Sequence, residues 1–295
     1  MKKNSKIIVA IIAVVAIVAG MFAACSTKDE DKKDNSGASS LGNITVISRE
    51  EGSGTRDAFT ELMDIVDEDK NDLTIETAEI TNSTSVMMST VAGNVNAIGY
   101  VSLGSLSNDV KALSLDGVAP STDTVKNGSY KLQRPFNIAY IDGKLNDVAK
   151  DFISFIMSKE GAKVVDAEGY ISIDTNSSYT STGMSGVVTL AGSTSVAPLM
   201  NVLADEYKKL NPDVKIEIQE SGSSAGIQSA IEGAVDIAMS SRDLKDDEAT
   251  KLKSEKIALD GIAVIINNNN PCNNITAQQV KQIYIGEIKT WDDIK

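Results

Sequence analysis

Hydroxyl side chains gather in four short turns of this sequence. The turns carry the letters R-E-E-G-S-G-T at 49–55, G-S-T-S at 192–195, S-G-S-S-A-G at 221–226 and S-S-R at 240–242. One turn of this kind predicts only a helix cap, because Ser and Thr are preferred there. Several together favour a ligand site, because helix starts offer free N–H groups with a partial positive charge. Gathered around one cleft, such neutral donors suit a tetrahedral oxyanion.

One arginine accompanies the hydroxyl groups. Arg49 directly follows an apolar run and stands four residues before Ser53, so we expect it to project at the same turn. A guanidinium can hold two oxygens of a phosphate group at once. The alternative is a surface ion pair with one of the two glutamates that follow. Arg56 and Arg242 are interpreted as supporting or surface charges.

One of the turns also fits the G-x-S-x-G pattern of serine hydrolases. That chemistry needs a general base beside the serine, normally a histidine, and the 295 residues contain no histidine. A phosphatase would need a metal cluster or an activated nucleophile, and zinc sites of the usual His/Cys kind are excluded. We therefore expect a binding protein with no metal and no cofactor, and not an enzyme.

The charge of the chain limits its partners. The net charge is −13, which argues against nucleic acid. Long-range steering would also oppose an anion, so an anion site must depend on short-range donors in a closed cleft. The chain has two cysteines; if Cys25 carries lipid, Cys272 has no disulfide partner.

The turns lie between apolar runs and amphipathic stretches. The alternation of the two predicts an α/β fold with mainly parallel strands. Ligands of such sheets bind at the carboxyl ends of the strands, where the hydroxyl-rich turns fall. The pattern predicts strands at 44–48, 187–191, 214–218 and 236–239, and helices at 57–65, at 197–210 and through 227–231.

Two further polar segments are interpreted as structural. Ser83–Val86 repeats the letters S-T-S-V of residues 193–196, but no comparable strand precedes it, so it predicts the cap of a short packed helix. The acidic run Asp246–Glu248 predicts a solvated helix face near an N-terminus.

The N-terminal residues have the layout of an export signal. Three lysines precede an apolar stretch at 7–19, which is too short to span a bilayer comfortably, and small residues precede Cys25. This pattern predicts a lipoprotein signal peptide at 1–24, lipid on Cys25 and a flexible polar tether at 25–41. The alternative is an uncleaved anchor helix. We expect the protein on the extracytoplasmic face of the cell membrane.

Several motifs together resemble the phosphate-binding protein (PstS-like) of bacterial ABC-type phosphate transporters. The resemblance implies a two-lobed periplasmic-binding-protein-like fold of type II, with mainly parallel sheets flanked by helices and a ligand cleft between the lobes. The segments that carry it are 49–55, 97–101, 191–198, 221–226, 236–242 and 283–288 with 291–293.

The resemblance also implies which residues bind the anion. Ser241 is a departure, because several family members have an aspartate there that accepts the proton of hydrogen phosphate. Selectivity for phosphate over sulfate is therefore less secure. The implied phosphate-binding residues are Arg49, Ser53, Gly54, Thr55, Thr194, Ser195, Ser223 and Ser241.

The order of the segments differs from that of the family, because the R-E-E-G-S-G-T half comes first. We interpret this as a circular permutation in which residues 170–186 bridge the family's usual termini; the alternative is a gene fragment or an artefact from tandem copies. On this interpretation one lobe combines 42–132 with 265–295, and the other spans 133–264. The chain would cross between them near Arg134–Phe136 and Ala263–Ile265.

The resemblance implies that the chain captures inorganic phosphate and delivers it to the permease subunits of an importer, and we expect a monomer. Two alternatives stay open. The ligand is another tetrahedral oxyanion such as sulfate or molybdate, or the chain is a surface lipoprotein or sensor with a degenerate site.

Overall fold

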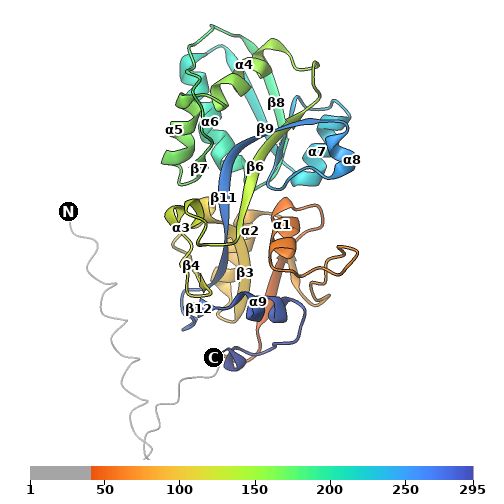
Figure 1. Cartoon of the computed structure of the whole chain (residues 1–295), viewed down its shortest axis with the longest axis vertical. Helices are drawn as coiled ribbons and strands as arrows, with labels where there is room; N and C mark the ends of the chain where they lie inside the picture. Colours follow the sequence, from red (N-terminus) through yellow and green to blue (C-terminus); the bar gives the residue numbers. More distant parts are fainter. Residues whose placement is uncertain (1–40, 295) are drawn as a thin grey trace, which may run out of the picture. The chain divides into compact units, whose positions relative to one another are not determined.

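The computed structural model describes residues 41–294 (Figure 1). The predicted signal peptide, the predicted lipid site Cys25 and all of the predicted tether except residue 41 lie outside the described residues. No helix within 41–294 is both long and apolar enough to cross a membrane.

Most strands form one continuous sheet. Its order is β2-β1-β3-β11-β6-β10-β8-β9, with β4 and β7 paired to β11, while β5 and β12 pair separately. The strands are β1 (Thr45–Arg49), β2 (Glu79–Thr81), β3 (Ala97–Ser102), β4 (Val110–Ala112), β5 (Ser114–Leu115), β6 (Gln133–Tyr140), β7 (Ile171–Ser172), β8 (Gly186–Gly192), β9 (Val214–Glu220), β10 (Ile237–Ser240), β11 (Lys253–Asn267) and β12 (Asn274–Ile275).

Helices cover the sheet, and most begin at a polar cap. The α-helices are α1 (Gly54–Leu62), α2 (Thr84–Gly93), α3 (Thr122–Lys126), α4 (Asp147–Ile156), α5 (Lys159–Ala167), α6 (Ala197–Leu210), α7 (Ser223–Ile231), α8 (Asp246–Ala249) and α9 (Ala277–Tyr284). Short 3₁₀ turns occupy Leu103–Ser105 and Trp291–Asp293.

The predicted elements are found with one shifted helix. The four predicted strands correspond to β1, β8, β9 and β10, and the predicted helix at 197–210 is α6. The prediction of a helix start at 57 was wrong, because α1 begins at Gly54. Ser53 is its cap and accepts a hydrogen bond from the Arg56 N–H at 3.4 Å.

The sheet is parallel at both ends and antiparallel in the middle. The pairs β1–β2, β1–β3, β8–β10 and β8–β9 are parallel. In the middle, β6 and β11 run side by side in opposite directions (Figure 1), and Gly261 is the register partner of Gln133. These two strands join the two halves of the described chain.

Each half has its own apolar core. One core draws its buried residues from 46–132 and 262–291, and includes the stacked rings of Phe59 and Tyr100, whose centroids are 4.0 Å apart. The other lies within 136–258, where Phe152 and Tyr207 pack with centroids 5.0 Å apart. The chain changes core along β6 and β11, so the groups at the ends of the other strands face each other across this crossing.

The first and last described segments lie next to each other. The N–H of Ile44 donates to the carbonyl of Lys289 at 2.8 Å, and the N–H of Trp291 donates to Gly42 at 3.1 Å. Both segments belong to the half that contains β1 and α9 (Figure 1).

Candidate oxyanion site

Hydroxyl groups from both halves of the described chain meet at the crossing. Thr55 lies in the first turn of α1, and its Oγ1 is 2.8 Å from Oγ of Ser195, which precedes α6. Oγ1 of Thr84, at the start of α2, lies 3.2 Å from Oγ1 of Thr194 and 3.1 Å from Oγ of Ser195. All four residues are at most 5% exposed. They form one buried cluster of neutral groups that can each donate or accept a hydrogen bond.

Arg49 supplies the positive charge of this cluster. It ends β1, and its side chain is only 2% exposed. Its Nη2 donates to Oγ1 of Thr194 at 3.1 Å, while Nη2 and Nε also donate to the carboxylate of Glu50 at 2.7 and 2.8 Å. Tyr100 Oη accepts from the Arg49 N–H at 3.1 Å and fixes the backbone there. The ion pair with Glu50 therefore forms, but the guanidinium is buried rather than on the surface, and it also reaches the opposite half.

A second group of hydroxyls lies where α7 begins. Oγ of Ser223 is 3.4 Å from Oγ of Ser241 and accepts from the Ser241 N–H at 3.2 Å. Gly54 faces both, since a Cβ there would lie 2.4 Å from Oγ of Ser223 and 2.8 Å from that of Ser241. Only glycine allows the start of α1 to approach so closely.

The residues predicted from the sequence are thus brought together, except that the hydroxyl of Ser53 contacts its own helix and not the opposite half. Ser53 is buried at the same turn, but the contact of its hydroxyl is the cap of its own helix. Arg49, Gly54, Thr55, Thr194, Ser195, Ser223 and Ser241 line the meeting point of the two halves.

Thr84 is the residue that the sequence interpretation missed. Ser83 does cap α2, since it accepts from the Val86 N–H at 3.2 Å, so the expectation of a cap was correct. The next residue, however, enters the hydroxyl cluster. The letters S-T-S shared by 83–85 and 193–195 were the signal that could have indicated it.

A buried ion pair lies behind the second hydroxyl group. Nη2 and Nε of Arg134 contact Oδ2 of Asp260 at 3.1 and 3.2 Å, and both side chains are 1% exposed. Oγ of Ser102 donates to the other carboxylate oxygen at 3.0 Å. Burial raises the pKa of Asp260, although Arg134 and Ser102 oppose the shift. Nη1 of Arg134 reaches the carbonyl of Ser241 at 3.4 Å.

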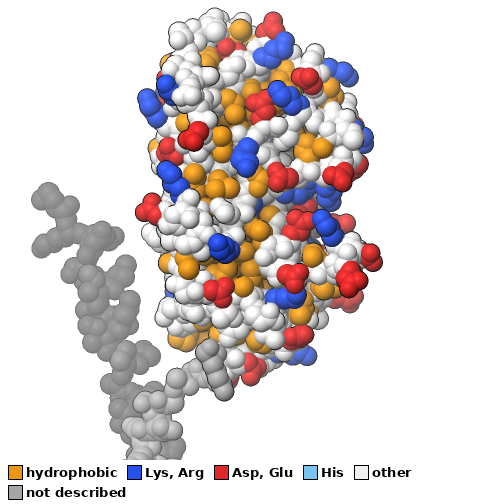
Figure 2. Space-filling model, viewed as in Figure 1, with side chains coloured by type: hydrophobic (Ala, Val, Ile, Leu, Met, Phe, Trp, Pro, Cys, Tyr) orange, Lys and Arg blue, Asp and Glu red, His pale blue; other side chains and the backbone are white. Residues whose placement is uncertain are grey.

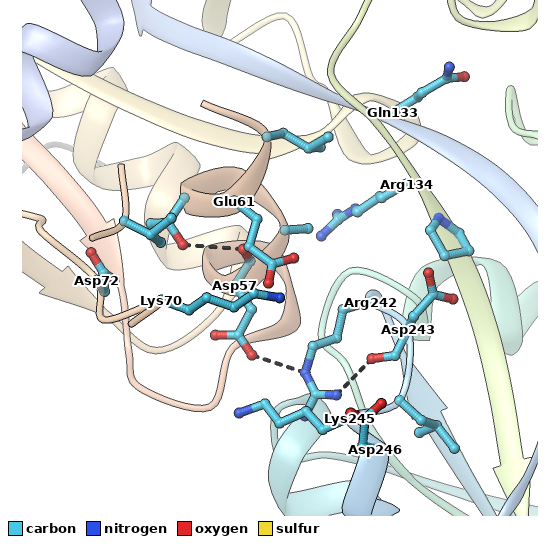
Figure 3. Close-up of a pocket in the computed structure, with 16 residues that line it drawn as sticks. Asp57, Glu61, Lys70, Asp72, Gln133, Arg134, Arg242, Asp243, Lys245 and Asp246 are labelled. Carbon is cyan, nitrogen blue, oxygen red and sulfur yellow. Dashed lines mark hydrogen bonds and ion pairs between the residues drawn. The ribbon is translucent and has the colours of Figure 1, made fainter. Parts of the chain in front are cut away.

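A cleft of about 660 Å³ opens beside the cluster, between α1 and the turn after β10 (Figure 3). Arg242 points into it and joins the halves: its Nε lies 2.9 Å from Oδ2 of Asp57, and its Nη1 lies 2.7 Å from Oε2 of Glu248. Burial raises the pKa of Asp57, against the opposing effect of Arg242. The cleft has charged side chains of both signs: Asp57, Glu61, Asp72, Asp243, Asp246, Lys70, Arg134, Arg242 and Lys245.

The expectation that Asp246–Glu248 is a solvated face was wrong for Glu248. This residue is 8% exposed and accepts two hydrogen bonds from Arg242. Although burial opposes the shift, these bonds and the N–H of Lys245 hold the pKa of Glu248 below its ordinary value.

Two further observations bear on ligand class. Figure 2 shows acidic and basic side chains mixed over the visible face, without a broad basic area. Within 41–294, no cluster of three or more His, Cys, Asp or Glu residues is arranged to hold a metal ion. The buried hydroxyl cluster is the candidate anion site on its own donors, since it combines neutral hydroxyls with the guanidinium of Arg49.

Comparisons with known proteins identify the family of the chain. The family model described as PBP superfamily domain matches residues 9–160 and 177–295. The phosphate-binding protein PstS 2 of Streptococcus agalactiae serotype V is 46% identical over 280 residues, 93% of each chain. PstS of Staphylococcus aureus USA300 is 38% identical over 111 residues, 35% of this chain and 34% of its own.

A solved structure is similar over most of the chain. The crystal structure of a phosphate-binding protein of a phosphate ABC transporter from Streptococcus pneumoniae TIGR4 is 50% identical, with a TM-score of 0.69. The match covers 86% of this chain and all of that one. The predicted fold class, a mixed α/β fold of the periplasmic-binding-protein kind, is thereby confirmed.

Proposed function

We infer the function of this chain from its family: it belongs to the PBP superfamily and, within it, to the PstS phosphate-binding proteins. The resemblance predicted from the motifs is thus confirmed. We propose that the chain captures inorganic phosphate between its two halves and delivers it to the permease subunits of an ABC importer. The single observation that carries the proposal is the buried guanidinium of Arg49 directed at a cluster of neutral hydroxyl donors.

The donors fit a phosphate group. Arg49 donates to Thr194, and the hydroxyls of Thr55 and Ser195 lie within hydrogen-bond distance of each other in the same buried cluster. A hydroxyl oxygen can also accept a hydrogen bond, so Ser241 can accept one from the protonated oxygen of hydrogen phosphate. We propose as binding residues Arg49, Gly54, Thr55, Thr194, Ser195, Ser223 and Ser241, with Ser53 holding the start of α1.

Capture needs no covalent step. Thr55 and Arg49 come from one half, and Thr194 and Ser195 come from the other, so opening the halves would divide the donor set. Closure gathers the donors and excludes water, and opening releases the anion. We propose residues 42–132 with 265–295 as one lobe and 133–264 as the other, and a protein that is not an enzyme and acts as a monomer.

We also propose that the protein is held at the membrane. The support is the order of lysines, apolar residues and small residues before Cys25. Lipid on Cys25 would leave residues 26–40 as a tether on the extracytoplasmic face. Mass spectrometry of the mature N-terminus tests this: an acylated cysteine supports the proposal, and an unmodified terminus or a retained signal contradicts it.

The permuted segment order remains a proposal. It is supported by the adjacency of Gly42 and Ile44 to Lys289 and Trp291, since a short link there would give the segment order that the motif resemblance implies. A variant that joins residue 294 to residue 42 with a short Gly/Ser linker, and is opened within 173–185, should fold and bind phosphate like the natural chain. Failure to fold would contradict the permutation.

Sulfate and molybdate are the second candidates, because Ser241 stands where a carboxylate would reject an oxyanion that has no proton. Isothermal calorimetry of the purified protein, stripped of bound anion, separates the candidates. Tight one-to-one binding of phosphate with little response to sulfate or molybdate supports the proposal. Tighter binding of sulfate or molybdate would show that this anion, and not phosphate, is the ligand. A folded sample that binds none of the three anions would contradict anion capture altogether.

A further inference from the structure

The start of α2 reaches the oxyanion site with two donors at once. Thr84 is 5% exposed, and its Oγ1 lies between Thr194 and Ser195, at 3.2 and 3.1 Å from their hydroxyl oxygens. Its backbone N–H also donates to Oγ1 of Thr194, at 3.3 Å. The main chain and the side chain of one residue therefore face the same point.

The guanidinium of Arg49 contacts the same hydroxyl oxygen as the Thr84 N–H. Oγ1 of Thr194 accepts from Nη2 of Arg49 at 3.1 Å and from the N–H of Thr84 at 3.3 Å. Two donors of one half thus converge on a single oxygen of the other half. A phosphate oxygen is an acceptor of the same geometry with a larger negative charge, so donors that converge in this way suit it better than they suit a neutral hydroxyl.

The fold holds α2 in this place. Gly99 of β3 lies against the helix, since a Cβ there would be 2.6 Å from Sδ of Met87 and 2.9 Å from Cγ2 of Val91. Met87 and Val91 are fully buried. At the other end of the helix, the side-chain amide of Asn267 donates to the carbonyl of Val91 at 3.2 Å. Packing and capping therefore fix the position of Thr84 rather than leaving it on a mobile loop.

The capping arrangement leaves the Thr84 hydroxyl free for the site. Ser83, not Thr84, accepts the hydrogen bond of the Val86 N–H that a helix cap requires. Thr84 makes its side-chain hydrogen bonds with the opposite half, to Thr194 and Ser195. Local helix formation gives no reason for a hydroxyl at this position.

We propose that Thr84 is a further phosphate-binding residue, which contributes both its Oγ1 and its backbone N–H. The anion is then held by the starts of α1, α2 and α7 and by the turn before α6, and not only by the turns recognised in the sequence. This inference depends on the proposed capture of phosphate.

The test is phosphate calorimetry on Thr84→Val, Thr84→Ser and the control Ser89→Ala. Valine keeps the shape and removes the hydroxyl, and the loss of one hydrogen bond to a charged group raises the dissociation constant about 10- to 100-fold. Serine retains both donors and stays within about threefold of the natural protein. Ser89 is an exposed residue of the same helix, and its replacement leaves the constant unchanged.

The outcomes separate this inference from the proposed function. If the natural protein binds phosphate and Thr84→Val binds it within about threefold as tightly, the role of Thr84 is overturned and phosphate capture stands. If the natural protein binds no phosphate, both are overturned. Should Thr84→Val fail to fold, Thr84→Ala removes the same hydroxyl and is judged by the same criterion.

Discussion

Two buried guanidinium groups lie near the site, and their surroundings differ. The side chain of Arg134 is 1% exposed, and that of Arg49 is 2% exposed. The partner of Arg134 is Asp260, which is equally buried and also accepts from Ser102. The partner of Arg49 is Glu50, which is 26% exposed, and Nη2 of Arg49 also extends to a hydroxyl of the opposite half.

The difference distinguishes a charge that stabilises the fold from a charge that can attract a ligand. In a buried ion pair the two charges compensate each other, and removing one partner leaves an uncompensated charge. The pair of Arg49 with Glu50 is weakened by water, so the guanidinium retains attraction for an anion. By this argument Arg134 stabilises the crossing of β6 and β11, and Arg49 is the arginine that we propose for phosphate binding.

The largest expected effect on stability comes from breaking the buried pair of Arg134 and Asp260. Arg134→Met leaves the carboxylate of Asp260 buried without a partner and should lower the free energy of unfolding by about 3–5 kcal/mol. Urea denaturation measures it. The double variant Arg134→Met/Asp260→Leu should recover most of the loss, and a loss under about 1 kcal/mol in the single variant would contradict the assignment.

Arg49→Met should act mainly on the ligand. Loss of a buried charged contact raises the phosphate dissociation constant about 100-fold, about 2.7 kcal/mol, as measured by calorimetry. Stability should change by less than in Arg134→Met, because the remaining Glu50 is partly exposed and can be hydrated. Equal effects of the two variants on stability, with phosphate affinity retained in both, would remove the distinction between the two arginines.

A third guanidinium sharpens the comparison, because Arg242 pairs with carboxylates of both halves. Asp57→Asn removes the pair across the halves, so closure is less favoured and the phosphate dissociation constant should rise about threefold to tenfold. Burial raises the pKa of Asp57, which means that its charged form is already disfavoured, and stability should change little. Unchanged affinity would show that this pair does not contribute to closure.

The smallest effect concerns pH. The pKa of Glu248 is held below its ordinary value by Arg242, although burial opposes this, so its contribution is present above the unfolded pKa and is lost as pH falls through the folded value. Glu248→Gln should therefore lower stability at pH 7 by about 1 kcal/mol, and the difference should shrink below about pH 4.5. A difference that stays constant down to pH 3 would contradict the ion pair.

The sequence predicted the helix ends and turns, which depend on residues close together in the chain. Helix α6 was predicted with its observed ends, 197–210; Pro198 lies in its first turn, and Asn211 follows its last residue. The hydroxyl-rich turns were found for the same reason, since a strand, a glycine or serine turn and a helix follow each other directly in the chain.

The remaining contacts join residues that are distant in the sequence. Thr84 meets Thr194 across 110 positions, and Arg134 meets Asp260 across 126. Neither the periodicity nor the spacing of a single sequence contains that information, so Thr84 was interpreted as part of a cap. The burial of Glu248 was missed similarly, because an acidic residue in a first turn is typical of a solvated helix start.

The central claim is that phosphate binds among the hydroxyls and Arg49, and a crystal structure of the protein with phosphate tests it most directly. We expect phosphate oxygens within about 3 Å of Nη2 of Arg49 and of the hydroxyls of Thr194 and Thr84. Phosphate bound instead in the neighbouring cleft, on Arg242 and Lys245, would contradict the account (Figure 3).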